Sequence, residues 1–461
     1  MSGRRLHFIA IGGAGMSGLA LVCRDLGAEV TGSDRAESSY TERLRSAGID
    51  SAIGHDAAQV PDGAEVVVST AIAEDNPELV RARERGQRVL HRGELLAELC
   101  ERGRLLAVAG THGKTTTAAM AIHALRETGG DPSFFLGGEL TGPGPDGAAA
   151  NAASGSGEWI IAEADESDGS FLKLTPEVAV ITNLELDHHS RWGSLGELSE
   201  AFAAFSAGSA GRVVSADVHL PGEAGRRQVR FGLEPRPGDP PAPGADLVAE
   251  AIEPLPGGGT RFRASGGGVD ADVELAVPGR HNVANALAAL GALAMAGADP
   301  EACAKALARF RGVARRMELK GESASGARVY DDYAHHPTEV EAVLAAAREL
   351  EPRRLIAAFQ PHLYSRTRAL ATELGAALAA ADEIAVLDVY PAREQPVGPF
   401  EGVSGVLVAE AAADHSGGRP VWWLPDSGVA ATALAPRLEP GDLLLTIGAG
   451  DIYKLAEALV E

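Results

Sequence analysis

The sequence contains few cysteines and is poor in basic residues relative to acidic ones. Cys23, Cys100 and Cys303 lie far apart and form no C-x-x-C pair, which argues against a disulfide framework and against a structural zinc site. The 41 basic residues face 64 acidic ones, so the formal charge is −23 at pH 7. This balance disfavours nucleic-acid binding, which depends on attraction to phosphates, although local cations or metal ions could still hold a small anionic substrate.

Long apolar runs are also missing, and none is long enough to span a bilayer. The N-terminal stretch MSGRRLHFIAIGGAGMSGLALVC has two arginines before an apolar run, but glycines interrupt the run and it lacks a small-residue cleavage site. Both features argue against a signal peptide. We therefore expect a cytoplasmic protein that binds neither a membrane nor a nucleic acid.

A chain of 461 residues, 45% hydrophobic and 23% charged, is typical of a globular protein with several domains. Strand-like and helix-like segments begin to alternate near residue 7, again near residue 104 and again near residue 328. Such alternation indicates parallel sheets and an α/β fold. We predict three domains, at 1–98, 99–313 and 314–461. The Pro- and Gly-rich stretch 231–246 is expected to be a surface loop.

The first glycine-rich motif is GGAGMSG, residues 12–18, which follows a predicted strand and precedes a predicted helix. It contains the pattern G-x-G-x-x-G. The motif suits NAD, with Asp34 at the end of the next strand as a ribose ligand, and it equally suits another phosphate-bearing ligand. Glycines in tight turns also serve packing, so the motif alone leaves these alternatives open.

The second glycine-rich motif is AVAGTHGKTTT, residues 107–117, and it departs from a full Walker A loop. Gly113, Lys114 and Thr115 supply the end of that pattern, but Val108 stands where the first glycine belongs. A strand is expected before the loop and a helix after it. The motif predicts a nucleotide site in which Lys114 neutralises the β- and γ-phosphates and Thr115 offers its hydroxyl to Mg²⁺.

Polar side chains follow several of the predicted strands. EADESDGSF (163–171) places four carboxylates within six residues, and NLELDHH (183–189) ends in two histidines. The carboxyl ends of parallel strands are where ligands bind, and Mg²⁺ prefers oxygen ligands. Spacing alone does not distinguish a metal site from a solvated acidic loop with structural histidines.

Two further motifs lie in the last third of the chain. In VYDDYAHHPTEV (329–340), Pro337 suits the first position of a helix, so the residues before it lie at a positive helix end. FQPHLYSRTR (359–368) places His362, Tyr364, Arg366 and Arg368 after another strand. Arginine is the best partner for a carboxylate, so this motif is compatible with a carboxylate-binding site. Ordinary surface charge is the alternative interpretation.

Taken together, six motifs resemble the Mur ligase family, and the resemblance runs essentially from end to end of the chain. The motifs are HFIAIGGAGMSGLA, AVAGTHGKTTT, EADESDGSF, TNLELDHH, GRHNVANALAA and YDDYAHHPTEV. Members of this family carry G-T-x-G-K-T in place of the full Walker A loop. The resemblance implies an N-terminal Rossmann-like domain for a UDP-sugar, a central P-loop ATPase domain with a mixed sheet, and a C-terminal Rossmann-like domain for an amino acid.

The activity that the resemblance implies is that of an ATP-dependent ligase of peptidoglycan precursor synthesis. It would join L-alanine to the lactyl carboxylate of UDP-N-acetylmuramate through an acyl phosphate, with two Mg²⁺ ions. These three small molecules, UDP-N-acetylmuramate, L-alanine and ATP, are the implied partners, and the protein is expected to be a monomer or a homodimer.

Motif by motif, the resemblance assigns roles to individual residues. Those expected at ATP are Gly110, Thr111, His112, Gly113, Lys114, Thr115, Thr116, His281, Asn282, Asn285, Arg315 and Asp331. Those expected at the UDP-sugar are Gly13, Ala14, Gly15, Met16, Ser17, Ser33, Asp34, Ser69 and Thr70. The amino acid would meet Tyr333, His335, His336 and Arg366, and the metal Thr115, Glu163 and His188. The catalytic set is Lys114, Glu163, His188, His335 and Arg366.

Other functions are compatible with parts of the sequence. The nearest is the muropeptide-recycling member of the same family, which adds a tripeptide to UDP-N-acetylmuramate. An NAD-linked oxidoreductase would leave Lys114, Glu163 and His188 without a role, and a third alternative is a P-loop switch without catalysis. The sequence also departs from the family after Asp187-His188, where His189 stands in place of the commoner Met or Leu, so the role of His189 stays open.

Overall fold

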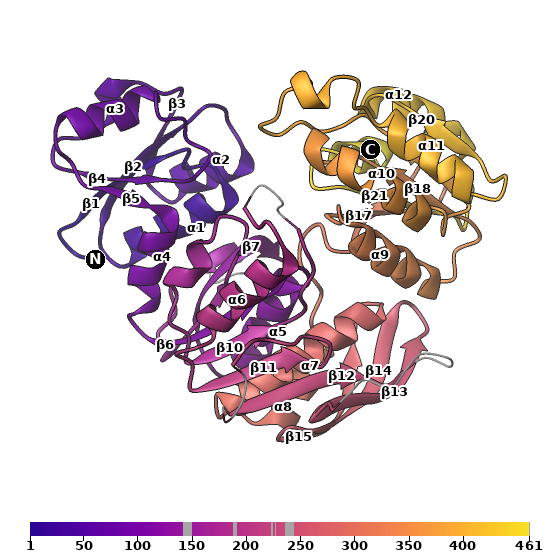
Figure 1. Ribbon diagram of the computed structural model, residues 1–461, viewed down its shortest axis with the longest axis horizontal. Helices are drawn as coiled ribbons and strands as arrows, with labels where there is room; N and C mark the ends of the chain where they lie inside the picture. The colour runs from indigo at the N-terminus through magenta and orange to yellow at the C-terminus, as the bar shows by residue number, and fades with distance from the viewer. Residues whose placement is uncertain (142–149, 188–190, 223–224, 226, 236–243, 461) are drawn as a thin grey trace. The chain divides into compact units, whose positions relative to one another are not determined.

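The computed structural model describes residues 1–461 except 142–149, 188–190, 223–224, 226, 236–243 and 461 (Figure 1). Within the described residues the chain forms three β-sheets with helices between the strands. It divides into two compact units. The first comprises Met1–Ile252, Phe262–Glu274 and Val283–Arg311, and the second comprises Glu253–Arg261, Leu275–Asn282 and Gly312–Glu461.

The first sheet is parallel throughout, with the strand order β3-β2-β1-β4-β5. Its strands are β1 (Arg5–Ile9), β2 (Glu29–Asp34), β3 (Asp50–Ile53), β4 (Glu65–Val68) and β5 (Val89–His91). The connecting helices are α1 (Ala14–Asp25), α2 (Ser39–Ser46), α3 (Pro77–Glu84) and α4 (Arg92–Cys100). The strand order changes direction between β1 and β4, and ligands of open α/β sheets bind at the carboxyl ends of strands at such a point.

The central sheet has the order β15-β14-β13-β12-β11-β10-β6-β9-β7-β8. It is mixed, because β7 and β8 are antiparallel whereas β6 is parallel to both of its neighbours. The strands are β6 (Arg104–Ala109), β7 (Ser133–Leu140), β8 (Ala150–Ala153), β9 (Trp159–Glu163), β10 (Val178–Ile181), β11 (Gly211–Ser215), β12 (Gln228–Leu233), β13 (Leu247–Leu255), β14 (Gly259–Gly266) and β15 (Val269–Leu275). The helices are α5 (Lys114–Glu127), α6 (Leu195–Phe205), α7 (Arg280–Met295) and α8 (Pro300–Leu307).

The first two sheets share one hydrophobic core, which explains why they belong to one unit. Helix α1 packs against β7 and β8. Leu19 and Cys23 of this helix belong to the same buried cluster as Phe135 and Ala162 of the central sheet. The contact needs a glycine in the helix, because a Cβ at Gly18 would lie 2.8 Å from the Cβ of Ala152.

The second unit contains a six-stranded sheet with the order β16-β17-β21-β18-β19-β20, in which only the edge strand β16 is antiparallel to its neighbour. The strands are β16 (Glu318–Glu322), β17 (Arg328–Asp332), β18 (Leu355–Phe359), β19 (Glu383–Val386), β20 (Val421–Trp423) and β21 (Leu443–Ile447). The helices are α9 (Pro337–Glu349), α10 (Tyr364–Leu378), α11 (Val406–His415), α12 (Ser427–Leu434) and α13 (Tyr453–Val460).

Separate hydrophobic clusters cover the two faces of this third sheet. One cluster takes side chains from α9, α10 and α11, and the other from α12 and α13. Helices on both faces of a mostly parallel sheet make a doubly wound fold. The predicted α/β fold class, with a mixed central sheet, is therefore confirmed. Within the described residues, no helix combines the length and the apolarity needed to cross a bilayer.

Candidate active site

The loop between β6 and α5 has the backbone that a phosphate-binding loop requires. Gly110 and Gly113 adopt φ angles of +131° and +78°, which side chains with a Cβ rarely tolerate. Asn183, which follows β10, binds the backbone of the loop. Its Oδ1 accepts from His112 N at 2.8 Å and its Nδ2 donates to His112 O at 2.9 Å. The N-terminus of α5, which carries a partial positive charge, thus opens at the edge of the sheet.

Lys114, the first residue of α5, lies over this loop. Its Nζ donates to Gly110 O at 2.7 Å, to Thr111 O at 3.1 Å and to Glu166 Oε2 at 2.9 Å. Burial favours the neutral amine, but Glu166, Asp165 and Glu163 outweigh it and raise the pKa of Lys114 above its usual value. Lys114 therefore stays charged at neutral pH, and an incoming phosphate would compete with Glu166 for it.

Glu166 was not among the site residues predicted from the sequence, although the acidic motif contains it. Its side chain is 1% exposed. Burial raises its pKa to about 7, and the Lys114 charge only partly opposes this shift. The carboxyl group therefore changes its charge near neutral pH, directly beside the lysine of the loop.

Thr115 and Glu163 come together from two different elements. Thr115 Oγ1 donates to Glu163 Oε2 at 2.9 Å, and Gly137 N donates to the same oxygen at 2.7 Å. A hydroxyl and a carboxylate side by side at the carboxyl end of β9 are the kind of oxygen donors that Mg²⁺ prefers. His188, the third predicted metal ligand, lies outside the described residues.

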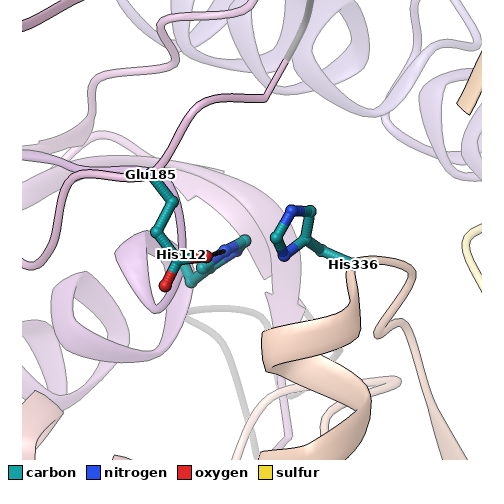
Figure 2. A group of neighbouring side chains, drawn as sticks. All are labelled: His112, Glu185 and His336. Atoms are coloured by element: carbon teal, nitrogen blue, oxygen red, sulfur yellow. Dashed lines mark hydrogen bonds and ion pairs between the residues drawn. The ribbon is translucent and has the colours of Figure 1, made fainter. Parts of the chain in front are cut away.

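The remaining predicted ATP residues of the first unit pack around the loop. His112 Nε2 lies 3.4 Å from Glu185 Oε2 (Figure 2). Thr111 Oγ1 donates to Glu185 O and accepts from Glu185 N, both at 2.9 Å. Asn285 of α7 accepts from Thr117 Oγ1 at 3.2 Å, which fixes α7 against the start of α5.

The glycine-rich loop after β1 begins helix α1. Gly13 caps the helix without a side-chain hydrogen bond, and the first turn contains no acidic residue. Asp34, predicted as a sugar ligand, accepts from Gly12 N at 2.9 Å and so holds the loop. Ser69 and Thr70 follow β4, on the other side of the point where the strand order changes.

Ser33, also predicted at the sugar, is fully buried and belongs to a network of polar side chains. Its hydroxyl donates to Glu78 at 2.7 Å, and Glu78 Oε2 lies 2.7 Å from His7 Nε2. His55 Nδ1 lies 2.8 Å from the other oxygen of Glu78. Sequence reasoning missed this network, since His7, His55 and Glu78 lie in three separate segments.

In the second unit, Arg315 and Asp331 form one arrangement. Arg315 has a φ of +59° and its Nε donates to Asp331 Oδ2 at 2.9 Å. Its Nη1 and Nη2 donate to Gly450 O at 3.1 Å and Gly448 O at 2.7 Å. Asp331 is fully buried and also accepts from Thr446 Oγ1 at 2.6 Å. Asp331 therefore orients Arg315 within this unit.

Four aromatic and basic side chains gather after β17 and β18. The ring centroids of Tyr333 and His335 are 5.6 Å apart, and those of His335 and His362 are 6.1 Å apart. Arg366, which is buried, donates from Nη1 to His362 Nδ1 at 3.2 Å. His362 also stacks on Tyr390 at 5.8 Å. His362 stood in a motif that the sequence singled out, but its place between the predicted residues His335 and Arg366 was not foreseen.

The other predicted residues of the second unit begin two helices. His336 directly precedes α9 (Figure 2). Its backbone N donates to Glu339 Oε2 at 3.3 Å. His281 and Asn282 lie at the start of α7, where Asn282 Nδ2 donates to Pro278 O at 2.7 Å. Burial lowers the pKa of His281 to about 4, so this ring is neutral at pH 7.

Three protein-family models together match nearly the whole chain. The model described as Mur ligase family, catalytic domain, matches residues 5–104, the Mur ligase middle domain matches 108–293, and the Mur ligase, glutamate ligase domain, matches 315–450.

Among curated proteins, the UDP-N-acetylmuramate–L-alanine ligase of Kineococcus radiotolerans is 49% identical to this chain, over 97% of this chain and 94% of its own. Among solved structures, the UDP-N-acetylmuramate-alanine ligase of Thermotoga maritima is similar with a TM-score of 0.83 and 30% identity, over 99% of this chain and 98% of its own. A murein peptide ligase of Psychrobacter arcticus has a TM-score of 0.71 over 100% of this chain and 99% of its own, but at 24% identity that likeness concerns the fold alone. The resemblance predicted from six motifs is thus confirmed: the chain belongs to the Mur ligase family.

Proposed function

We propose that this protein joins L-alanine to the lactyl carboxylate of UDP-N-acetylmuramate, with conversion of ATP to ADP and phosphate, in peptidoglycan precursor synthesis. One observation carries the proposal. A single unit holds two loops suited to phosphates, one after β1 and one after β6, and an enzyme that binds both a nucleotide sugar and ATP needs two such loops. The 49% identity to a ligase of that name supports the choice of substrates.

In the proposed reaction, an oxygen of the lactyl carboxylate attacks the γ-phosphorus of ATP, and the bond from that phosphorus to the β–γ bridging oxygen breaks. ADP leaves and an acyl phosphate forms. The amine of L-alanine then attacks the acyl carbon, loses a proton, and phosphate departs from the tetrahedral intermediate. Two anions meet in the first step, so the site must supply positive charge. The charged Lys114, beside the loop carbonyls, is suited to this task.

The donor set around the loop fits a magnesium ion. The Thr115 hydroxyl and the Glu163 carboxylate are hard oxygen donors that already face each other at 2.9 Å. We assign them to one Mg²⁺, and His188 to a second. When bound, Mg²⁺ neutralises charge on the transferred phosphoryl group.

Further roles and the domain boundaries complete the proposal. The domains are 1–98 for the UDP-sugar, 99–313 for ATP and 314–461 for the amino acid. The glycine loop at 13–17, with Ser33, Asp34, Ser69 and Thr70, binds the UDP-sugar. His281, Asn282, Asn285 and Arg315 serve ATP, and Tyr333, His335, His336 and Arg366 serve L-alanine and the acyl phosphate.

The test is phosphate release from Mg-ATP in the presence of UDP-N-acetylmuramate and one acceptor at a time: L-alanine, glycine, L-serine or the tripeptide of the recycling reaction. We expect release that requires the sugar and is fastest with L-alanine, and that Lys114→Ala abolishes. Release with the tripeptide but not with L-alanine would transfer the protein to the recycling reaction. Absence of release with every acceptor would refute the proposal.

A further inference from the structure

Arg92 lies beside the glycine-rich loop although it is distant from it in sequence. It follows β5 directly and is the first residue of α4, so it stands at the carboxyl edge of the first sheet, the edge at which the loop after β1 also lies. Its guanidinium reaches the loop: a Cβ built on Gly15 would lie 3.4 Å from Arg92 Nη1. A larger residue at position 15 would therefore meet this cation.

The other terminal nitrogen of Arg92 is held by the acidic loop that follows β9. Arg92 Nη2 donates to Asp168 Oδ2 at 2.8 Å, and Asp165 Oδ2 lies 3.8 Å from the same nitrogen. The Asp168 side chain is 6% exposed, and its second oxygen accepts from Ser170 N at 2.9 Å. Asp168 is thus a fixed carboxylate that sets the direction of the Arg92 side chain.

This arrangement leaves positive charge at the start of α1. The Asp34 carboxylate accepts from Gly12 N, before the helix begins. The helix itself has no side-chain cap and no acidic residue in its first turn, so this turn suits an anionic ligand. A guanidinium presents several N–H groups in a rigid fork and can hold one anion at each terminal nitrogen. With Asp168 at Nη2, Nη1 remains on the side of Gly15.

We propose that Arg92 binds the diphosphate of the nucleotide sugar together with the loop at 13–17, and that Asp168 is the positioning residue that holds Arg92 for this contact. The proposal rests on the proposed function, since it names a further ligand of the same UDP-sugar site.

A purely structural ion pair between α4 and the acidic loop would behave differently from a ligand contact. Loss of such a pair would lower the melting temperature and leave the affinity for the nucleotide sugar unchanged. Loss of a ligand contact would reduce that affinity at an unchanged affinity for ATP.

The experiment is calorimetric titration of UDP-N-acetylmuramate, of UDP and of ATP, each alone, into the full-length protein. We expect Arg92→Gln to weaken both ligands at least tenfold and Arg92→Lys to weaken them less, because lysine keeps the charge but not the fork. Asp168→Asn should weaken binding severalfold, and the double variant Arg92→Gln/Asp168→Asn should bind no more weakly than Arg92→Gln alone, since Asp168 acts through Arg92.

Arg88→Gln is the matched control. Arg88 precedes β5 at its amino end and pairs with Glu65 at 2.9 Å and Glu98 at 2.7 Å, so its loss should leave both affinities unchanged. A wild-type affinity in Arg92→Gln would overturn the inference and leave the proposed function intact. A loss of ATP affinity equal to the loss of UDP affinity would also overturn it, because that pattern reports a structural defect. Failure of the wild-type protein to bind either ligand would overturn both proposals.

Discussion

Replacing Lys114 by methionine should make the stability of the ATP-binding unit depend on pH in a way that the wild-type protein does not. The reason is Glu166, which is 1% exposed and accepts from Lys114 Nζ at 2.9 Å. Removing one partner of a buried ion pair lowers the free energy of unfolding by about 3–5 kcal/mol when the remaining group stays charged. Glu166 can become neutral by taking up a proton, since burial raises its pKa to about 7 even with Lys114 present.

The size of the pH-dependent part follows from this pKa. A group whose pKa is raised on folding contributes stability that is complete below its unfolded pKa and is lost as the pH rises through its folded pKa. In the wild type the loss for Glu166 begins near the unfolded pKa of 4.5 and is complete near pH 7. In Lys114→Met the pKa of Glu166 rises further, so the loss of stability continues between pH 7 and pH 8. The variant therefore loses stability over about one more pH unit than the wild type. One unit corresponds to about 1.4 kcal/mol.

The assay is urea unfolding at pH 6 and pH 8, followed by tryptophan fluorescence. Trp192 contributes to this signal, and its Nε1 donates to Glu166 O at 3.1 Å. We expect Lys114→Met to be about 1.4 kcal/mol more destabilising at pH 8 than at pH 6. In a Glu166→Gln background the same substitution should cost equally at both values. An equal cost at both pH values with Glu166 intact would refute the view that this carboxyl group titrates against Lys114.

Three further predictions concern other parts of the chain. The pKa of His281 is about 4 in the folded protein against 6.5 for an ordinary histidine. As the pH falls, the unfolded chain therefore takes up the proton first, and the free energy of unfolding should fall by about 3 kcal/mol between pH 6.5 and 4. In urea unfolding across this range, the free energy of unfolding of His281→Gln should depend less on pH. Asn151→Ala removes a buried hydrogen bond to Ala14 O, so calorimetry should show weaker binding of UDP-N-acetylmuramate with ATP binding retained, and thermal unfolding a loss of about 1–3 kcal/mol. Glu78→Gln takes the charged partner from a buried network that includes His7, so denaturant unfolding should show a loss of about 3 kcal/mol, and a loss within experimental error would contradict the assigned role of the network.

Much of the fold was predictable because local signals are strong wherever a buried parallel strand precedes a glycine and a helix. The segments before Gly13 and Gly113 are continuous apolar runs, and the predicted strands β1 and β6 lie there. Strands β7 and β8 were missed, since SFFLGGEL contains two consecutive glycines and ANAA is short and without β-branched residues. Their place at one end of the central sheet depends on tertiary contacts with α1, which no local pattern reports.

The candidate site likewise has residues that local sequence signals identify and residues that only tertiary contacts identify. Motif spacing brought attention to Lys114, Thr115 and Glu163, because each follows a strand and parallel strands end at a common edge. The choice of Glu166 as the lysine's partner could not be made from spacing, since four carboxylates follow β9 within six residues and only packing decides which of them turns toward Lys114.

Arg92 illustrates why such residues escape sequence reasoning altogether. Its neighbours in the chain form an ordinary helix start, and an arginine there has no motif to mark it. The residue gains a role only because β5 lies beside β4 in the sheet and the acidic loop after β9 reaches the start of α4. Three segments separated by dozens of residues then meet at one guanidinium, with Gly15 on one side and Asp168 on the other. Charge that is placed by topology in this way is visible only in the folded chain, and the binding experiment with Arg92→Gln tests whether the protein uses it.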